Sequence, residues 1–307
     1  MRIAIVGAGG VGGLVGGLLA HAGDEVAFVA RGKQLEALRA RGLRVESPRA
    51  TFELSRVEAA DDPSQLAAAE VVLVAVKSWQ VPEIAPRLAS LIAPGGFVVP
   101  LENGVDAAPT LVRALGEERV AGGFCAMLAW LDSPGLIKHA GEVLRVVVGE
   151  RTGGGSLRLE RLVERLNAAR VDASIAPDIE AALWEKFLFI AAFGGVAAAA
   201  RVPAAAVRTT PETRALLTAA MEEIAQLARA RGVRLAEAAV RDALAVVDAL
   251  PAHATASMQR DIQAGRPSEL QDQLGAVVRL ASQAGVAVPT CKSLLAVLLP
   301  QELAARG

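Results

Sequence analysis

The stretch RIAIVGAGGVGG (residues 2–13) decides the fold of the first half of the chain. Its first residues predict a β-strand, and its glycines predict a tight turn into a helix that runs to about Ala22. Short apolar strands then alternate with helical segments, as in a parallel sheet covered on both faces. Further strands are expected at 25–30, 71–76 and 96–100, and further helices at 33–41 and from about Pro82. This pattern predicts an α/β domain with a doubly wound sheet.

The expected secondary structure changes twice along the rest of the chain. Residues 119–150 resemble strands joined by short turns and predict an antiparallel extension of the sheet, followed by a helix near 156–169 and a strand at 171–176. After Pro177 only helices are expected, at 178–200, 211–231, 235–249, 270–284 and 291–305. We therefore predict a dinucleotide-binding domain at 1–176 and an all-α domain at 177–307. A small-molecule site is expected in the cleft between them.

Composition narrows the class of protein. Apolar residues make up 53% of the chain, which predicts a sizeable core, and the formal net charge of −1 argues against a nucleic-acid partner. The most apolar helical window, 187–200, is too short to span a membrane, and no secretion signal is apparent, so a cytoplasmic protein is expected. Cys125 and Cys291 have no metal-ligand spacing, and no metal site is expected.

The glycine loop predicts a dinucleotide site. Gly7, Gly9 and Gly12 form a G-x-G-x-x-G pattern between a strand and a helix, the context in which this pattern is informative. Gly7 permits the tight turn, Gly9 lets backbone N–H groups approach a pyrophosphate, and Gly12 lets the helix pack against the strand. We expect Gly10 and Val11 of the same loop to contact the cofactor as well.

The end of the second strand indicates which dinucleotide is bound. Proteins that use NAD usually place Asp or Glu there to bind the ribose 2′-hydroxyl group. Here the sequence reads Val29-Ala30-Arg31-Gly32. Because an arginine suits a 2′-phosphate, Arg31 predicts NADP(H); the alternative is an exposed charge with no ligand.

Two other polar residues follow predicted strands of the sheet, at the edge where ligands bind in such folds. Lys77 is a candidate cofactor contact. Asn103 is a candidate hydrogen-bond donor to the substrate or to the nicotinamide end of the cofactor. A solvated lysine and a turn residue before Gly104 are the alternatives.

Lys186 lies near the start of the apolar segment WEKFLFIAAFGG (184–195). A carbonyl reductase needs a proton donor for the oxygen while the cofactor supplies the hydride. Partial burial among aromatic neighbours would make the Lys186 ammonium a readier donor. The alternative is a lysine with a buried stem that pairs with Glu180 or Glu185.

The downstream segment SMQRDIQAGRPSEL (257–270) includes the hydroxyl of Ser257 and the carboxylates of Asp261 and Glu269. Ser257 and Asp261 share one face if this segment is helical. Ser257 is a candidate contact for a substrate carboxylate or hydroxyl, and Glu269 is a candidate to bind the substrate or to orient Lys186. If these groups converge with the lysine, they form a site suited to carbonyl reduction.

Together these motifs resemble the ketopantoate reductase (2-dehydropantoate 2-reductase) family over nearly the whole chain. The resemblance rests on IVGAGGVG (5–12), VKS (76–78), ENG (102–104), WEK (184–186) and SM..D...GR..E (257–269). It implies a Rossmann domain followed by a helical domain, and NADPH-dependent reduction of a 2-oxo acid, with ketopantoate as the first candidate. It further implies a role for each matching residue: Lys186 as general acid, Asn103 and Ser257 as substrate contacts, Glu269 as a support of the site beside substrate and cofactor, and Lys77 and Arg31 as cofactor contacts.

The resemblance fails at two positions. Members that act on ketopantoate usually carry asparagines four and eight residues after the lysine, where this chain has Ile190 and Gly194. Because both positions share the helix face of Lys186, the substrate site is expected to be less polar and roomier. Ile190 and Gly194 are therefore candidate substrate contacts for a 2-oxo acid less polar than ketopantoate.

Other functions stay open at this level. One is a dehydrogenase of the same two-domain plan that acts on a 3-hydroxy acid or an opine; the absence of a histidine in a recognisable site context argues against it. Another is a non-catalytic NADP-binding sensor, against which Lys186, Ser257 and Glu269 argue together. Apolar helices such as 291–299 would also allow a homodimer.

Overall fold

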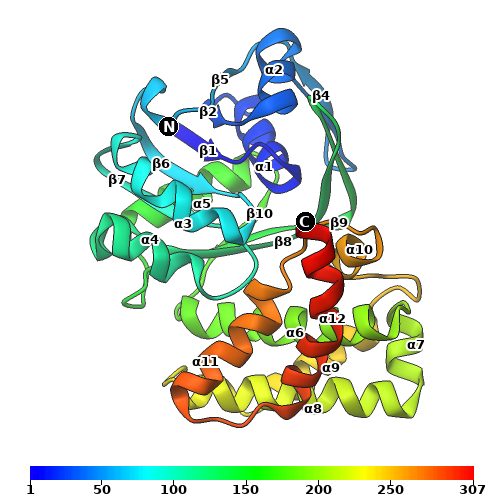
Figure 1. Cartoon of the computed structure of the whole chain (residues 1–307). Helices are drawn as coiled ribbons and strands as arrows, with labels where there is room; N and C mark the ends of the chain where they lie inside the picture. Colours follow the sequence, from blue (N-terminus) through cyan, green and yellow to red (C-terminus); the bar gives the residue numbers. More distant parts are fainter. The chain divides into compact units, whose positions relative to one another are not determined.

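The computed structural model describes residues 1–307, which divide into two compact units. The first unit contains residues 1–102 and 107–179, and the second contains residues 103–106 and 180–307. All strands lie in the first unit, while the second is helical (Figure 1). The segment 103–106 joins the second unit although residues of the first unit flank it, which a single cut in the sequence does not anticipate.

Two five-stranded sheets form the framework of the first unit. In the first sheet every pairing is parallel, and the order is β5-β2-β1-β6-β7. Its strands are β1 (Arg2–Val6), β2 (Glu25–Val29), β5 (Glu58–Ala60), β6 (Ala69–Val74) and β7 (Ile92–Pro100). The register sets Val6 opposite both Val29 and Val74, so three strands end side by side where the glycine loop begins.

The second sheet corrects the expected antiparallel extension of the first. Strands β8 (Gly122–Ser133) and β9 (Leu136–Gly149) are antiparallel, as expected, but β9 pairs on its other side with β3 (Leu43–Glu46) and β10 (Asp172–Ile175). Strand β4 (Thr51–Leu54) completes this sheet beside β3. The segments β3 and β4 were not expected as strands, because they are short and β3 is stabilised by a partner distant in sequence.

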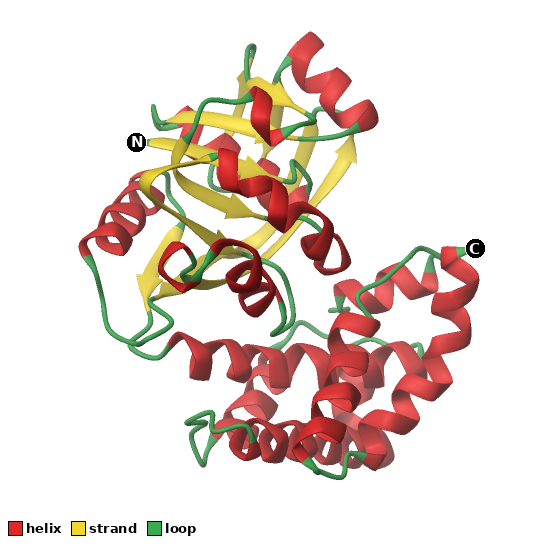
Figure 2. Ribbon diagram, turned by 60° about the vertical axis from the view of Figure 1, so that its left-hand side comes forward, coloured by secondary structure: helices red, strands yellow, loops and turns green.

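Helix α1 (Gly10–His21) packs between the two sheets. It is apolar on nearly every side, and its glycines allow close approach. A Cβ at Gly16 would lie 2.6 Å from Ile5 of the first sheet, and one at Gly17 would lie 2.9 Å from Val45 of the second. The remaining α-helices of this unit are α2 (Gly32–Arg41), α3 (Val81–Ile84), α4 (Ala107–Leu115) and α5 (Leu157–Ala168). Because α3 and α4 cover the face of the first sheet opposite α1, the predicted doubly wound arrangement is confirmed (Figure 2).

The second unit is built around α6 (Ile179–Ala200), whose Phe187, Leu188 and Ala191 are fully buried in the helical core. At 22 residues the helix is longer than its most apolar window, and by length and composition it could cross a membrane. However, 67% of its apolar stretch is buried inside the protein, as in the core helix of a globular domain. Around it lie α7 (Ala204–Thr209), α8 (Pro211–Ala230), α9 (Ala239–Ala249), α10 (Ser257–Gln263), α11 (Ala276–Ala284) and α12 (Pro289–Arg306).

Candidate active site

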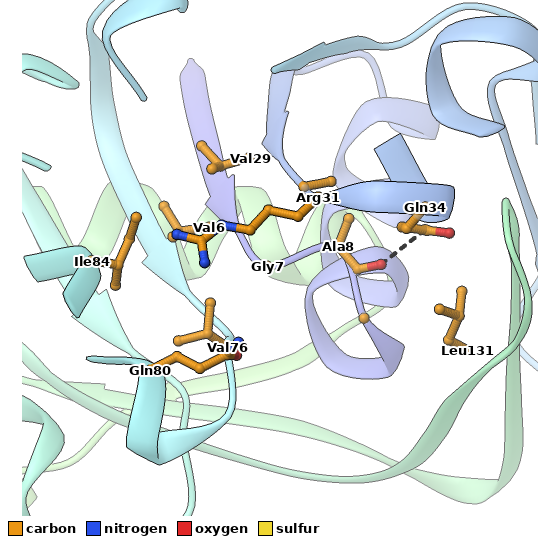
Figure 3. Close-up of a pocket in the computed structure, with 12 residues that line it drawn as sticks. Val6, Gly7, Ala8, Val29, Arg31, Gln34, Val76, Gln80, Ile84 and Leu131 are labelled. Carbon is orange, nitrogen blue, oxygen red and sulfur yellow. Dashed lines mark hydrogen bonds between the residues drawn. The ribbon is translucent and has the colours of Figure 1, made fainter. Parts of the chain in front are cut away.

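The glycine loop borders a pocket of about 200 Å³ in the first unit (Figure 3). The pocket is lined by the last residues of β1 and β2, by the segments that follow β1, β2 and β6, and by β8. The lining residues are Val6, Gly7, Ala8, Gly9, Val29, Ala30, Arg31, Gln34, Val76, Gln80, Ile84 and Leu131. Gly9 is open, because a Cβ there would meet no atom within 4 Å. A Cβ at Gly12 would instead lie 2.0 Å from the backbone oxygen of Gly7. The loop is thus tightly packed at Gly12 and open to a ligand at Gly9.

The start of α1 offers unpaired N–H groups beside this pocket. No side chain caps the helix, which begins at Gly10, and its first intrahelical bond runs from the Gly13 N–H to the Gly9 oxygen at 2.7 Å. The amides of Gly10, Val11 and Gly12 therefore have no intrahelical acceptor and form the positive end of the helix dipole. Such an end binds phosphate groups.

A buried glutamine that the sequence did not single out holds the loop in place. The Nε2 of Gln34 donates to the backbone oxygen of Ala8 at 2.9 Å, and its Oε1 accepts from the Gly135 N–H at 2.8 Å. Gln34 therefore connects the glycine loop to the turn between β8 and β9. Its role depends on a partner far away in sequence, so no local pattern could indicate it.

The two candidate cations of the cofactor site lie in different surroundings. Arg31 lines the pocket, and its guanidinium donates to the carboxylate of Glu83 at 2.8 Å. Lys77 follows β6 and is exposed, with its ammonium 5.7 Å from the centre of the Trp79 ring. Its backbone N–H donates to the side chain of Gln80, which lines the pocket. Arg31 is thus the only cationic side chain in the lining.

In the second unit three candidate residues form one hydrogen-bond chain. The Nζ of Lys186 donates to Oδ1 of Asn103 at 2.8 Å, and Nδ2 of Asn103 donates to Oε2 of Glu269 at 3.0 Å. Glu269 is only 6% exposed, while Lys186 and Asn103 are half-buried. An ammonium and a buried carboxylate are therefore linked through a single amide, which accepts from one and donates to the other.

Four aromatic side chains lie on α6 before and after this lysine. Trp184 and Phe187 are buried and meet edge to face, with 5.5 Å between their ring centres. Phe189 stacks on Phe193 at 5.8 Å. Lys186 thus stands on a helix whose neighbouring side chains are largely apolar and aromatic.

Asp272 adds a second carboxyl beside Glu269. It lies in the π-helical turn Gln271–Gly275, and its backbone oxygen would be 3.0 Å from a Cβ at Gly104. Its Oδ2 is buried and has no hydrogen-bond partner. Burial, and then the charge of Glu269, raises the pKa of Asp272 to about 6. Sequence reasoning missed this residue, because the signal is its position against the turn at Gly104.

The residues on either side of Ser257 pack against Gly194. Ser257 begins α10, so the segment that carries Ser257 and Asp261 is helical, as their predicted shared face requires. The Ser257 hydroxyl is exposed and makes no hydrogen bond within the protein. Its neighbours Ala256 and Met258 lie against Gly194, where a Cβ would be 3.6 Å from Ala256 and 3.1 Å from the methyl group of Met258. The prediction of extra room beside Gly194 is therefore wrong, because the methyl group of Met258 lies there.

Ile190 continues this face of α6, and Gln273 of the turn Gln271–Gly275 lies near it. Ile190, one turn after Lys186, is half-buried and packs against the core. Gln273 is 2% exposed, and its Oε1 lies 3.7 Å from the Cβ position of Gly194 without a hydrogen-bond partner. The face beyond Lys186 is thus apolar except for one buried amide.

The chain matches known proteins over nearly its whole length. Residues 3–153 match the family described as Ketopantoate reductase PanE/ApbA, and residues 178–302 match its C-terminal part. A 2-dehydropantoate 2-reductase of Halobacterium salinarum is 32% identical over 96% of each chain. The chain belongs to the ketopantoate reductase family. The resemblance predicted from the sequence motifs is confirmed.

Solved structures show the same fold. A PanE/ApbA family ketopantoate reductase from Ralstonia eutropha matches with a TM-score of 0.90 and 29% identity over the full length of both chains. A D-mandelate dehydrogenase bound to NADH and anilino(oxo)acetate also matches with a TM-score of 0.90, but at 21% identity it shows the shared fold alone. The predicted fold class is confirmed, and the protein is an oxidoreductase of the ketopantoate reductase family that acts on CH–OH groups.

Proposed function

We propose that this ketopantoate reductase family member reduces a 2-oxo acid to the 2-hydroxy acid with NADPH, and that Lys186 is the proton donor. The observation that carries the proposal is the hydrogen-bond chain Lys186–Asn103–Glu269. Ketopantoate is the first candidate substrate, because 2-dehydropantoate 2-reductases are among the relatives that match over nearly the full chain.

The chain accounts for how the proton is held. Glu269 accepts from Nδ2 of Asn103, which turns the amide oxygen toward Lys186. Reduction of a 2-oxo acid adds a hydride to C2 and a proton to the oxygen on C2. When bound, NADPH supplies the hydride. The proton comes from an Nζ–H bond of Lys186, and the neutral amine that remains regains a proton from solvent.

Two features of the pocket suit groups of NADPH, and only the second, the contact with a 2′-phosphate, distinguishes it from NADH. The amides at the start of α1 suit a pyrophosphate. Arg31 provides the cationic side chain of the lining, and a guanidinium binds a 2′-phosphate through charge-assisted hydrogen bonds. Arg31→Ala is therefore expected to weaken NADPH binding by about tenfold or more and to leave NADH binding nearly unchanged.

A second candidate substrate class is a 2-oxo acid less polar than ketopantoate. Ile190 on α6 and the methyl group of Met258 on α10, which lies against Gly194, make the surroundings beyond Lys186 largely apolar. A substrate hydroxyl buried against such a face without a partner loses about 1–3 kcal/mol of binding. Branched or aromatic side chains avoid that loss.

The test is consumption of NADPH or NADH by the purified protein with ketopantoate and with branched, aromatic and linear 2-oxo acids. Turnover of at least one 2-oxo acid, with NADPH preferred, is the expected result. Tight NADPH binding without turnover of any of them would contradict the proposal and favour a sensor. Preference for ketopantoate over the whole panel would remove the second candidate class.

A further inference from the structure

The acidic partner of Arg31 comes from the helix that carries Ile84, a lining residue of the pocket beside the glycine loop. Arg31 lies in the segment after β2, whereas Glu83 lies on α3, the helix that places Ile84 in the lining. The 2.8 Å bond between them therefore joins a lining residue of the pocket to the residue next to another lining residue, Ile84. Figure 3 shows the Arg31 side chain extended across the pocket, toward the side on which Ile84 lies.

The pair is the only ion pair that either residue makes. Both side chains are about half exposed, at 49% for Arg31 and 61% for Glu83. An exposed pair of this kind is weak and easily exchanged for another partner. Neither side chain is fixed by the fold, so a ligand that enters the pocket competes for both.

The two dinucleotides differ at the group that this pair would meet. A 2′-phosphate carries a charge of about −2 and needs Arg31, so it must displace the Glu83 carboxylate and then lie near it. A 2′-hydroxyl group is neutral and donates a hydrogen bond to a carboxylate. Glu83 thus opposes one ligand and can accept from the other.

We propose that Glu83 is a cofactor-selectivity residue that lowers the preference of this protein for NADPH over NADH. The inference deepens the NADPH assignment and rests on the proposed function for its choice of ligands. The carboxylate that NAD-dependent proteins carry at the end of β2 is absent from that strand; here Glu83 supplies one from α3.

The experiment compares Glu83→Gln with the wild-type protein by direct titration with NADPH and NADH in the absence of substrate. Glutamine keeps the size of the side chain and removes its charge. Glu36→Gln is the matched control, because Glu36 is exposed on the neighbouring helix α2 and takes part in no ion pair. Thermal unfolding verifies that each variant is folded.

The ratio of the dissociation constant for NADH to that for NADPH is expected to rise about fivefold or more in Glu83→Gln, and to stay unchanged in Glu36→Gln. The rise should shrink in high salt, because both charges are exposed. A ratio equal to that of the wild type, or a lower one, would overturn the inference. Because no turnover is measured, a failure to reduce 2-oxo acids leaves this result intact.

Discussion

The ammonium nitrogen of Lys186 lies 2.8 Å from the side-chain oxygen of Asn103, an asparagine that follows the sheet of the first unit in sequence but belongs structurally to the helical unit. The amide nitrogen of the same residue is bonded to buried Glu269. Asn103 therefore positions the lysine and satisfies the carboxylate at the same time.

Asn103→Ala is expected to lower kcat by about 10- to 100-fold, because Lys186 loses the acceptor that orients it. The same change leaves Glu269 buried without this donor, which is expected to cost about 1–3 kcal/mol of stability. Asn167→Ala is the control: it removes two bonds to the backbone of Ala173 in the other unit and should leave kcat unchanged. Steady-state kinetics and denaturant unfolding of both variants measure the two effects, and an Asn103→Ala enzyme as active as the control would contradict this role.

Alanine substitutions at two glycines of the loop are expected to have different effects, one on stability and the other on cofactor binding. Gly12→Ala places a Cβ 2.0 Å from the Gly7 oxygen, so the helix must shift and the protein should lose about 2 kcal/mol or more of stability. Gly9→Ala has open space, so the fold should persist while NADPH binding weakens about tenfold by obstruction of the loop amides. Thermal unfolding and cofactor titration separate the two, and equal stability of both variants would show that the close packing at Gly12 is not required.

Asp272 predicts a pH-dependent stability difference. Its pKa is raised to about 6 in the folded protein, so folding takes up a proton between roughly pH 4 and pH 6. Stability is therefore lost as the pH rises through this window, and the full penalty is present above it. After allowance for partial exposure, Asp272→Asn should gain about 1–2 kcal/mol at about pH 8 and nothing at about pH 4. Urea unfolding of both proteins at the two pH values checks this; a gain at the lower pH only would reverse the sign.

Ile190 predicts a change of substrate preference. Ile190→Asn adds a polar group one turn from Lys186 and should raise kcat/KM for ketopantoate about tenfold relative to a branched apolar 2-oxo acid. Ile190→Leu keeps the apolar character and should leave that ratio unchanged. If both variants shift the ratio equally, shape at this position matters rather than polarity.

Much of the framework follows from local pattern. The RIAIV strand and the glycines after it specify a parallel sheet with a buried helix, and the apolar run at Ala69–Val74 has the composition of a strand covered on both faces. Lys186 could be selected as the cation of a largely apolar segment, and Asn103 and Glu269 because they follow a predicted strand and a predicted turn. Their mutual bonds required the fold.

The features that local pattern missed depend on partners distant in sequence. Strand β3 forms because β9 pairs with it, setting Val45 opposite Ile137. The proposed role of Glu83 depends on its ion pair with Arg31, a lining residue of the pocket, and the position of Asp272 depends on its contact with the turn at Gly104. At Gly194 the sequence shows a missing side chain, but only the position of Met258 shows that the space is filled.

The most direct test of the account is the rate of carbonyl reduction by Lys186→Ala, compared with Lys292→Ala, in which an exposed lysine of α12 is removed. The account predicts that kcat with the best 2-oxo acid falls by about 10²- to 10⁴-fold in Lys186→Ala, with NADPH affinity unchanged and the control fully active. A Lys186→Ala enzyme that retains the kcat of the control would contradict the assignment of Lys186 as the proton donor.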